Sequence, residues 1–283
     1  MRSIHILACN FSVVSDCEEF LAAFDGRTQH ASQNFAASRH HRLEVLRTDR
    51  GYTLREDGRP LDPQSDAEGA AEAVFWRMHE LSIAALPEFT KIHAACASWR
   101  GRRFVVAGPA RSGKTTLMTR MLFEGFEVHC DDMVVLRDGE VLPFPRRLWI
   151  RSSAVLLLPQ IVPFVAKSRR IHDHFSLDLA ELGFDWHADT APVDAVFFLH
   201  PNHGSDTRLE ACPKYAMAQL VMSQSGLPAG GAQKWVKEIC AMVDAASSYL
   251  LHCGNLDSAV ELVRNALAQQ PRKSHVGEIR SDE

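Results

Sequence analysis

Residues 103–116 read RFVVAGPARSGKTT, in which a short apolar run leads into a glycine-containing segment. The part GPARSGKT matches the phosphate-loop pattern G-x-x-x-x-G-K-[ST] at every specified position. The glycines of such a loop let backbone N–H groups point inward at phosphate oxygens, and the N-terminus of the next helix adds partial positive charge. The apolar run predicts a strand, and the residues after the loop predict an amphipathic helix to about Phe123. The stretch therefore predicts a nucleotide site in an α/β fold.

The predicted nucleotide-binding residues form one continuous segment: Gly108, Pro109, Ala110, Arg111, Ser112, Gly113, Lys114, Thr115 and Thr116. Lys114 is expected to reach the β- and γ-phosphates, and the Thr115 hydroxyl is expected to bind Mg²⁺. Arg111 occupies a variable position of the pattern, so its contact with phosphate is left open. The same loop serves ATPases, GTPases and kinases, so it does not decide what happens to the nucleotide.

Two carboxylates, Asp131 and Asp132, follow a short predicted strand over residues 127–130, sixteen and seventeen residues after Thr115. If that strand lies beside the loop strand, these carboxylates lie near the metal. Consecutive strand residues point to opposite faces, so the two should differ in role. One could hold the metal, and the other could accept a proton from an attacking hydroxyl. The alternative is an Asp pair that only begins a turn.

His93 lies on a strand predicted over residues 92–97, just before the loop strand. If the two strands form a hairpin around Trp99, Arg100 and Gly101, His93 is carried to the end of the sheet that holds the loop. There it could bind a phosphate oxygen or tune a neighbouring Asp. A histidine on a strand is more often structural, and both interpretations stay open at this point.

Together, KIHAA around His93, the loop GPARSGKT and the pair in HCDD resemble the catalytic domain of HPr kinase/phosphorylase. The spacings match that family: twenty-two residues from His93 to Thr115 and seventeen from Thr115 to Asp132. The resemblance implies a P-loop fold like the nucleotide domain of phosphoenolpyruvate carboxykinase. It also implies transfer of a phosphoryl group from ATP, with Mg²⁺, to a serine of a protein or peptide substrate.

The resemblance assigns roles to the candidate residues. It implies Asp132 as the base towards the acceptor hydroxyl, His93 as its helper and Lys114 as the phosphate clamp. Thr115 and Asp131 become the expected metal ligands. The match covers roughly residues 90–145 well, and the first 90 residues fit the divergent HPr-kinase-related proteins and the kinases of lasso-peptide clusters.

Two departures from the family limit what the resemblance implies. The loop ends in Thr115 instead of Ser, which is chemically conservative. The family's downstream glutamate-arginine-glycine segment has no counterpart, and residues 143–147 (PFPRR) occupy that region. We therefore predict a serine or threonine kinase and leave reverse phosphorolysis and the acceptor open. Two alternatives are a nucleotide-binding regulatory or scaffold module without phosphoryl transfer, and a small-molecule kinase.

The chain divides into three predicted parts. Residues 1–89 form a small β-rich domain with a connecting helix over residues 66–85, which Asp66 would cap. Residues 90–270 form the kinase domain, and residues 271–283 form a polar, mobile tail. Hairpin turns are predicted within the first part at Asp49-Arg50-Gly51 and Asp57-Gly58. Residues 151–190 give no clear pattern.

Several further residues have chemical potential but a commoner structural explanation. The sequence His172-Asp173-His174 has metal-like spacing, although a solvated loop is the more frequent outcome. Two basic clusters could grip phosphate or an acidic peptide, although charge runs are usually solvated: Arg146, Arg147 and Arg151, and Lys167, Arg169 and Arg170. Trp76 on the connecting helix is expected to pack in the core. Of fourteen histidines, only His93 has a position that suggests a role.

The composition is that of an ordinary globular protein, with 46% hydrophobic and 23% charged residues among 283. The formal net charge is −4, so the chain lacks the whole-protein basic field of nucleic-acid binders. No run approaches the ~20 apolar residues of a membrane span, and acidic residues after the first apolar run favour a strand over a signal peptide. We expect a cytoplasmic protein with no nucleic-acid or membrane partner. A homo-oligomer, implied by the family, stays open.

Overall fold

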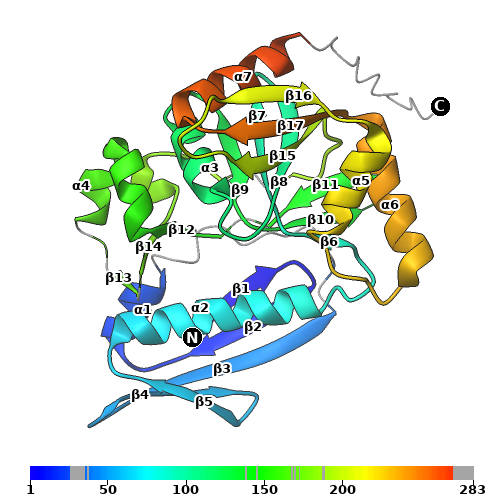
Figure 1. The fold of residues 1–283 in the computed structure, drawn as a ribbon. Coiled ribbons are helices and arrows are strands. Elements are labelled where there is room, and N and C mark those ends of the chain that lie inside the picture. The colour runs from blue at the N-terminus through cyan, green and yellow to red at the C-terminus, as the bar shows by residue number, and fades with distance from the viewer. Residues whose placement is uncertain are drawn as a thin grey trace, which may run out of the picture.

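The phosphate-loop segment follows the fourth strand of a six-stranded sheet, whose order is β16-β17-β15-β8-β7-β9 (Figure 1). Strands β17, β15 and β8 are parallel to one another, and β7 is antiparallel to both β8 and β9. The three strands predicted around the loop are β7, β8 and β9. The six strands span Ala94–Trp99 (β7), Arg102–Ala107 (β8), Glu127–Cys130 (β9), Ala195–Pro201 (β15), Arg208–Ala211 (β16) and Ser247–Cys253 (β17).

The computed structural model describes residues 1–25, 36, 38–137, 139–144, 146–166, 168, 170–171, 173–186 and 189–269. In these residues helices combine with four β-sheets, so the predicted α/β class is confirmed at the level of a mixed α/β fold. Three positions weighed above, Lys167, Arg169 and His172, lie outside the described residues, as does the predicted tail 271–283.

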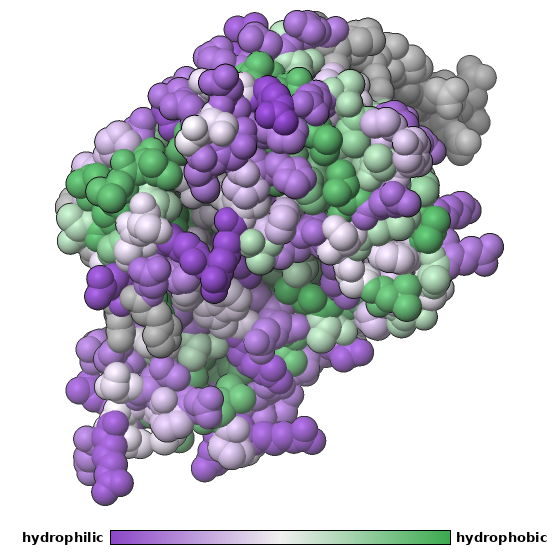
Figure 2. Space-filling view, viewed as in Figure 1, coloured by the Kyte–Doolittle hydropathy of each residue, from purple (hydrophilic) through white to green (hydrophobic). Residues whose placement is uncertain are grey.

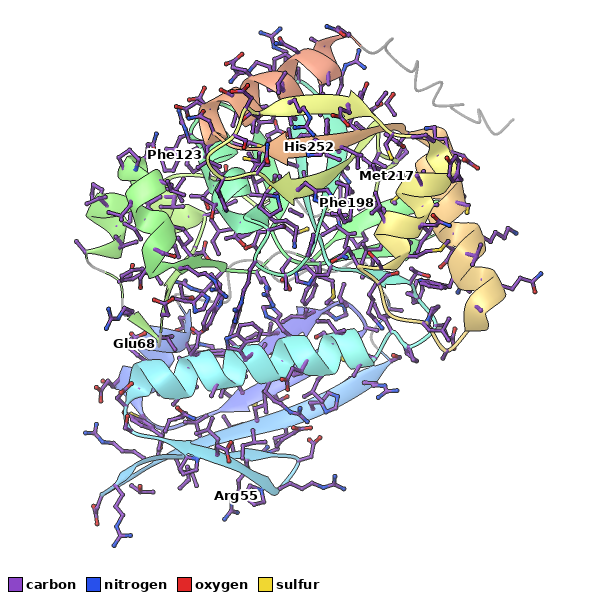
Figure 3. All side chains as sticks on the ribbon, in the orientation of Figure 1. Arg55, Glu68, Phe123, Phe198, Met217 and His252 are labelled. Atoms are coloured by element: carbon purple, nitrogen blue, oxygen red, sulfur yellow. The ribbon has the colours of Figure 1, made fainter. Side chains whose placement is uncertain are left out.

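Alternate residues of β8 enter two cores, one on each face of the central sheet. Phe104 packs on the side of α3 and α7, whereas Val105 packs on the side of α5 and α6. Figure 3 labels Phe198 of β15 and Met217 of α5, two members of the second core. Covering both faces explains why the inner strands are nearly continuous apolar runs. The helices span Lys114–Leu122 (α3), Lys214–Met222 (α5), Gly231–Ala245 (α6) and Leu256–Ala268 (α7).

Two small sheets extend the larger unit. Strands β10 and β11 form a hairpin, and β10 pairs with β6. Strands β12, β14 and β13 form a second sheet in the region that the sequence leaves unassigned. The elements are Lys91–Ile92 (β6), Val134–Arg137 (β10), Glu140–Pro143 (β11), Leu148–Arg151 (β12), Ser152–Leu157 (η1), Pro159–Ile161 (η2), Val162–Val165 (α4), Arg170–Ile171 (β13), His174–Leu177 (β14) and Ala180–Leu182 (η3).

The N-terminal unit is a five-stranded sheet, in the order β1-β2-β3-β4-β5, with two helices (Figure 1). The two predicted hairpin turns connect β3 to β4 and β4 to β5. The start of the chain, predicted as one strand, is instead a hairpin, because Leu7 adopts a left-handed φ of 51°. The elements span Arg2–Ile6 (β1), Cys9–Val14 (β2), Glu18–Asp25 (α1), Arg39–Thr48 (β3), Gly51–Glu56 (β4), Arg59–Gln64 (β5) and Ala67–Ala84 (α2).

The core of the N-terminal unit continues into the larger unit. Helix α2 begins after the predicted cap Asp66, whose side chain accepts a hydrogen bond from the Gly69 N–H. Val135, Leu142 and Phe144, around the β10–β11 hairpin, belong to the same buried cluster as the inner face of α2. Helix α2 accordingly lies between the five-stranded sheet and the larger unit (Figure 1). Apolar packing thus fixes α2 against the segment that leads to the candidate site.

Hydrophilic residues cover most of the face shown in Figure 2. Hydrophobic residues gather on its left side near α4, where Leu156, Leu157 and Val162 are exposed. Among the residues that the structure describes, no helix has both the length and the apolar sequence needed to cross a bilayer.

Candidate functional site

The predicted phosphate loop joins the end of β8 to the start of α3. Lys114 is the first residue of α3, and Gly113 before it adopts a left-handed φ of 96°. Arg111 is also left-handed, with a φ of 66°, which is unfavourable for a residue other than glycine. The first N–H groups of a helix lack partners within the helix, so a turn of this kind presents them to a ligand. The loop therefore has the backbone arrangement that binds anions.

A cavity of about 500 Å³ opens beside this loop. Seven consecutive residues of the predicted segment, from Ala110 to Thr116, line it. Three other predicted residues, His93, Asp131 and Asp132, line the same cavity from two further segments. The candidate residues that the sequence singles out are thus brought together in space.

Lys114 is buried at the base of the loop, with 5% of its surface exposed. Its Nζ donates hydrogen bonds to the carbonyl oxygens of Gly108 at 2.7 Å and Pro109 at 3.0 Å. These two residues of the predicted segment therefore meet Lys114 through their backbone. Burial lowers the pKa of the Lys114 ammonium to about 8, although Asp132 and Asp131 oppose the shift. An anion in the cavity would favour the charged form of Lys114.

Asp131 is a buried carboxylate without full hydrogen bonding. It is 3% exposed, and its Oδ1 has no hydrogen-bond partner among the described residues. Burial raises the pKa of Asp131 to about 6, against the opposing effects of Arg146 and of a hydrogen bond with the Thr115 side chain. A buried oxygen in this state is expensive unless a ligand binds it. Asp131 and Thr115 supply the oxygen donors that Mg²⁺ prefers, so the predicted metal ligands fit the ion.

Asp132 lies between a histidine and an arginine. Its Oδ1 is 3.5 Å from His93 Nε2, and its Oδ2 is 3.0 Å from Arg146 Nη2. Burial lowers the pKa of His93, and the Lys114 ammonium lowers it further, so the imidazole is neutral at pH 7. The backbone N–H of His93 donates to the Gln224 carbonyl at 2.8 Å, which holds the start of the hairpin in place. Asp132 therefore has one charged and one neutral neighbour.

The two carboxylates have different environments, whereas their predicted difference in role stays a prediction. Asp131 is buried, whereas 26% of the Asp132 side chain is exposed to the cavity side of the protein. The predicted hairpin before the loop is confirmed, because Ala94 pairs with Ala107 and brings His93 to the loop end. The sequence thus predicts the local geometry of this edge.

The aspartate strand does not lie directly beside the loop strand, the condition considered for bringing the carboxylates near the metal. Strand β9 pairs with β7, where Cys96 lies opposite Cys130, because the β7–β8 hairpin already occupies that edge of β8. Strand β7 is antiparallel to both neighbours, so β9 runs in the same direction as β8. The carboxyl ends of β8 and β9 therefore meet at one edge, and the carboxylates reach the cavity from one strand further away.

A second part of the cavity wall comes mainly from the region that the sequence leaves unassigned. Strand β12 contributes Trp149 and Arg151, whose side chains share one face because they are two residues apart. His174 of β14 and His203 also line the cavity. The interpretation that only His93 is placed for a role is therefore wrong, as is the solvated loop expected for His174. The sequence signal was weak here, because residues 148–150 are all apolar and show no alternation of polarity.

The consecutive residues Arg146 and Arg147 have different environments. Arg147 is 6% exposed, and its Nη2 lies 2.9 Å from Glu181 while its Nη1 lies 3.7 Å from Asp178. These contacts make Arg147 a buried structural cation. Arg146 instead lines the cavity and contacts Asp132. Of the basic clusters weighed in the sequence, Arg146 and Arg151 reach the cavity.

Cationic side chains outnumber carboxylates around the cavity. Among the residues that the structure describes, its wall contains four cationic side chains and two carboxylates: Arg111, Lys114, Arg146 and Arg151, and Asp131 and Asp132. A cationic wall beside a helix N-terminus suits a ligand with several phosphates. Carboxylates are also the groups that metal-assisted phosphate chemistry uses as metal ligand and as proton acceptor.

A scan of the chain against protein-family models finds no matching family. A search of the curated proteins finds no match. The function is therefore inferred from the residues and distances given above.

Proposed function

We propose that the protein is an ATP-dependent kinase that transfers the γ-phosphoryl group to a serine or threonine hydroxyl of a protein or peptide. The observation that carries this proposal is the convergence of Lys114, Asp131 and Asp132 on one cavity beside the glycine-containing loop. Their arrangement supports the finer assignment of the larger unit as a P-loop domain of the HPr-kinase and PEP-carboxykinase type.

The loop and Lys114 bind and orient the nucleotide in this proposal. Backbone N–H groups of residues 113–116 hold the phosphate oxygens, and Lys114 exchanges its bonds with the Gly108 and Pro109 carbonyls for bonds to the β- and γ-phosphates. The exchange restores a full charge to a buried amine with a lowered pKa. The same ammonium stabilises the charge that develops on the transferred group.

Asp131 and Thr115 would hold Mg²⁺. The Oδ1 of Asp131, which has no hydrogen-bond partner within the described parts of the chain, and the neighbouring Thr115 hydroxyl support this, since each is an oxygen donor in the wall of the cavity. When bound, the ion neutralises charge on the β- and γ-phosphates.

Asp132 accepts the proton of the acceptor hydroxyl. The acceptor oxygen attacks the γ-phosphorus, the bond to the β,γ-bridging oxygen breaks, ADP leaves, and the hydroxyl proton passes to a carboxylate oxygen of Asp132. Neutral His93, whose Nε2 lies 3.5 Å from Oδ1, can donate an N–H to this carboxylate and help to orient it for the step.

The test uses purified protein, Mg²⁺ and ATP labelled at the γ-phosphate. A degenerate set of serine- and threonine-containing peptides serves as acceptor, and free serine and glycerol are assayed in parallel for a small-molecule kinase. We expect label on peptides, a loss of about 10³-fold in Asp132→Asn and in Lys114→Met, and no loss in Asp244→Asn, an exposed carboxylate on α6. ATP binding without label on any acceptor would contradict the kinase.

A second candidate function is a nucleotide-binding regulatory module that transfers nothing. The lack of a counterpart to the HPr-kinase family's downstream glutamate-arginine-glycine segment favours it, since residues 143–147 read PFPRR in that region. This candidate predicts ATP binding that needs Lys114. It also predicts that any ATP hydrolysis is unaffected by Asp132→Asn. The labelling experiment therefore separates the two functions.

A further inference from the structure

Trp76, a residue of helix α2 in the N-terminal unit, reaches the wall of the candidate site. The guanidinium carbon of Arg146 lies 4.8 Å from the centroid of the Trp76 ring. The Trp76 ring also meets Trp149 edge to face, with the ring centroids 5.2 Å apart. Arg146 and Trp149 both line the cavity, so α2 forms a layer directly behind this wall. Trp76, which the sequence predicts to pack in the core, therefore packs against the wall of the candidate site.

Arg146 is held between an aromatic ring and a carboxylate. Its Nη2 contacts Asp132, and its Nε is buried and has no hydrogen-bond partner in the part of the chain that the structure describes. A guanidinium can stack its face on an aromatic ring while its edge binds a carboxylate. Arg146 is oriented in this way, with Trp76 against its face and Asp132 at its edge.

The neighbouring Arg147 is held by ion pairs and hydrogen bonds. Its guanidinium meets Asp178 and Glu181, and it also donates to the Ser176 side chain at 3.0 Å and to the Ser176 carbonyl at 3.0 Å. Such a network fixes the planar group without help from an aromatic ring. Arg146 has one carboxylate contact among the described residues, so its orientation depends on the ring.

Packing between the units keeps the ring in position. His79, one helical turn after Trp76, lies with its ring centroid 4.1 Å from Phe75 and 4.9 Å from Phe144. Phe144 is fully buried and precedes Arg146 by two residues. The backbone that carries Arg146 and the helix that carries Trp76 are therefore clamped together.

We propose that Trp76 is a positioning residue of the site, which holds Arg146 against Asp132 and so makes the N-terminal unit part of the catalytic machinery. The effect on phosphoryl transfer rests on the proposed kinase function. Without the ring, Arg146 can turn into the cavity and leave Asp132 in a different orientation. Turnover then falls while nucleotide binding by the loop and Lys114 is retained.

The first experiment measures ATP turnover and nucleotide affinity of the full chain. Trp76→Ala is expected to lower kcat about tenfold and to change KM for ATP less than twofold. Trp76→Phe, which keeps a ring face, is expected to recover most of the activity. In the Arg146→Ala background, Trp76→Ala should cause no further loss. Full additivity of the two substitutions would overturn the proposal.

A matched control removes another tryptophan whose ring contacts an arginine guanidinium. The guanidinium of Arg100 lies 4.6 Å from the Trp99 ring centroid at the far end of β7. Trp99→Ala is expected to reduce stability and leave kcat unchanged. An equal fall in kcat for Trp99→Ala and Trp76→Ala would mean that Trp76 supports only the fold.

The second experiment measures the contact without any activity. A urea-unfolding cycle over wild type, Trp76→Ala, Arg146→Ala and the double variant, without nucleotide, should show coupling of about fivefold in the unfolding constant. Coupling below twofold would overturn the stacking that the proposal needs. If wild type neither binds nor hydrolyses ATP, the proposed function fails and the catalytic role of Trp76 fails with it. The unfolding cycle would still report whether the Trp76–Arg146 contact exists.

Discussion

The two ends of strands β7, β8 and β9 differ in whether their buried polar side chains have hydrogen-bond partners. At the end away from the phosphate loop, Ser98 Oγ donates to Glu127 at 2.8 Å and lies 3.1 Å from His129 Nε2. At the loop end, Asp131 Oδ1 and Ser112 Oγ are buried and have no hydrogen-bond partner among the described residues. A cavity lies at each end, of about 220 Å³ at the far end and about 500 Å³ at the loop end.

The difference separates a structural network from a binding site. A buried polar group without a partner costs roughly 1–3 kcal/mol, whereas a paired group costs little. The far end satisfies its side chains within the protein, so it stabilises the sheet. The loop end leaves an oxygen of Asp131 unsatisfied beside a lysine with a lowered pKa, which destabilises the free protein. A ligand with phosphates and a metal would remove that cost.

Among the substitutions that compare the two ends of the sheet, Asp131→Asn should produce the largest effect and test the comparison most directly. Loss of a metal ligand is expected to lower Mg²⁺-dependent ATP turnover by about 10²-fold or more. The same change should stabilise the free protein at pH 8. The pKa of Asp131 is raised to about 6 in the folded chain, so ionisation above that pH opposes folding.

The pH dependence gives this prediction its control. The destabilising contribution of Asp131 is present above pH 6 and is lost as the pH falls towards 4, where the folded carboxyl is protonated. In urea unfolding without Mg²⁺, the unfolding free energy of Asp131→Asn should therefore exceed that of the wild type by about 2 kcal/mol at pH 8 and by little near pH 4. A variant that is less stable than wild type at pH 8 would show that Asp131 has a structural partner.

Gly108→Ala tests whether the loop end has room for a Cβ atom at this position. A Cβ at Gly108 would lie 2.9 Å from the Leu199 carbonyl oxygen and 3.0 Å from Ser112 Oγ. The Leu199 atom belongs to the backbone of β15, so the loop must shift, and ATP affinity should fall by at least about tenfold. The control is Gly101→Ala at the far end, where φ is +76° but no atom lies within 4 Å. It should reduce stability by about 1 kcal/mol and leave ATP affinity unchanged.

Ser98→Ala tests the far end. The substitution removes the hydroxyl that Glu127 and His129 share, so the unfolding free energy should fall by about 1–3 kcal/mol. ATP affinity and turnover should be unchanged, because the network lies at the opposite end of the sheet from the loop. Calorimetry and the labelling assay measure both properties. A loss of turnover without a loss of stability would mean that the far end communicates with the site.

The sequence predicts this site well where the chemistry is local. The loop, the helix that Lys114 begins, and the hairpin that carries His93 follow from glycine positions and polarity patterns within short segments. The meeting of His93 with Asp132 does not follow from the hairpin alone, since strand β9 is placed by long-range pairing with β7.

The rest of the site depends on contacts between distant segments. Arg146 and Arg147 are chemically identical in the sequence, and their separation arises from Trp76 on one side and Glu181 on the other. His174 reaches the cavity because β14 pairs with β12, in a region of short strands whose polarity pattern is weak. No local signal specifies such pairings, so the second part of the wall could not be predicted.

The smallest expected effect concerns proton uptake by Lys114 at the loop end. Burial lowers its pKa to about 8, so about half of the free protein carries a neutral amine at pH 8. Phosphate binding favours the ammonium, so ATP binding should take up a proton. ATP affinity is therefore expected to fall about fourfold between pH 7 and pH 8.5. Isothermal titration calorimetry in buffers with different ionisation enthalpies measures the proton uptake directly.

Lys114→Arg provides the matched control for this titration, because a guanidinium stays protonated across the whole range. Its ATP affinity is expected to be weaker than that of wild type but constant between pH 7 and pH 8.5, with no proton uptake. Asp131 and His93 titrate below this range, since the pKa of Asp131 is about 6 and that of His93 is lowered by burial. Proton uptake that persists in Lys114→Arg would therefore place the titrating group outside the loop end, and the contrast between the two ends of the sheet would no longer explain the lowered pKa.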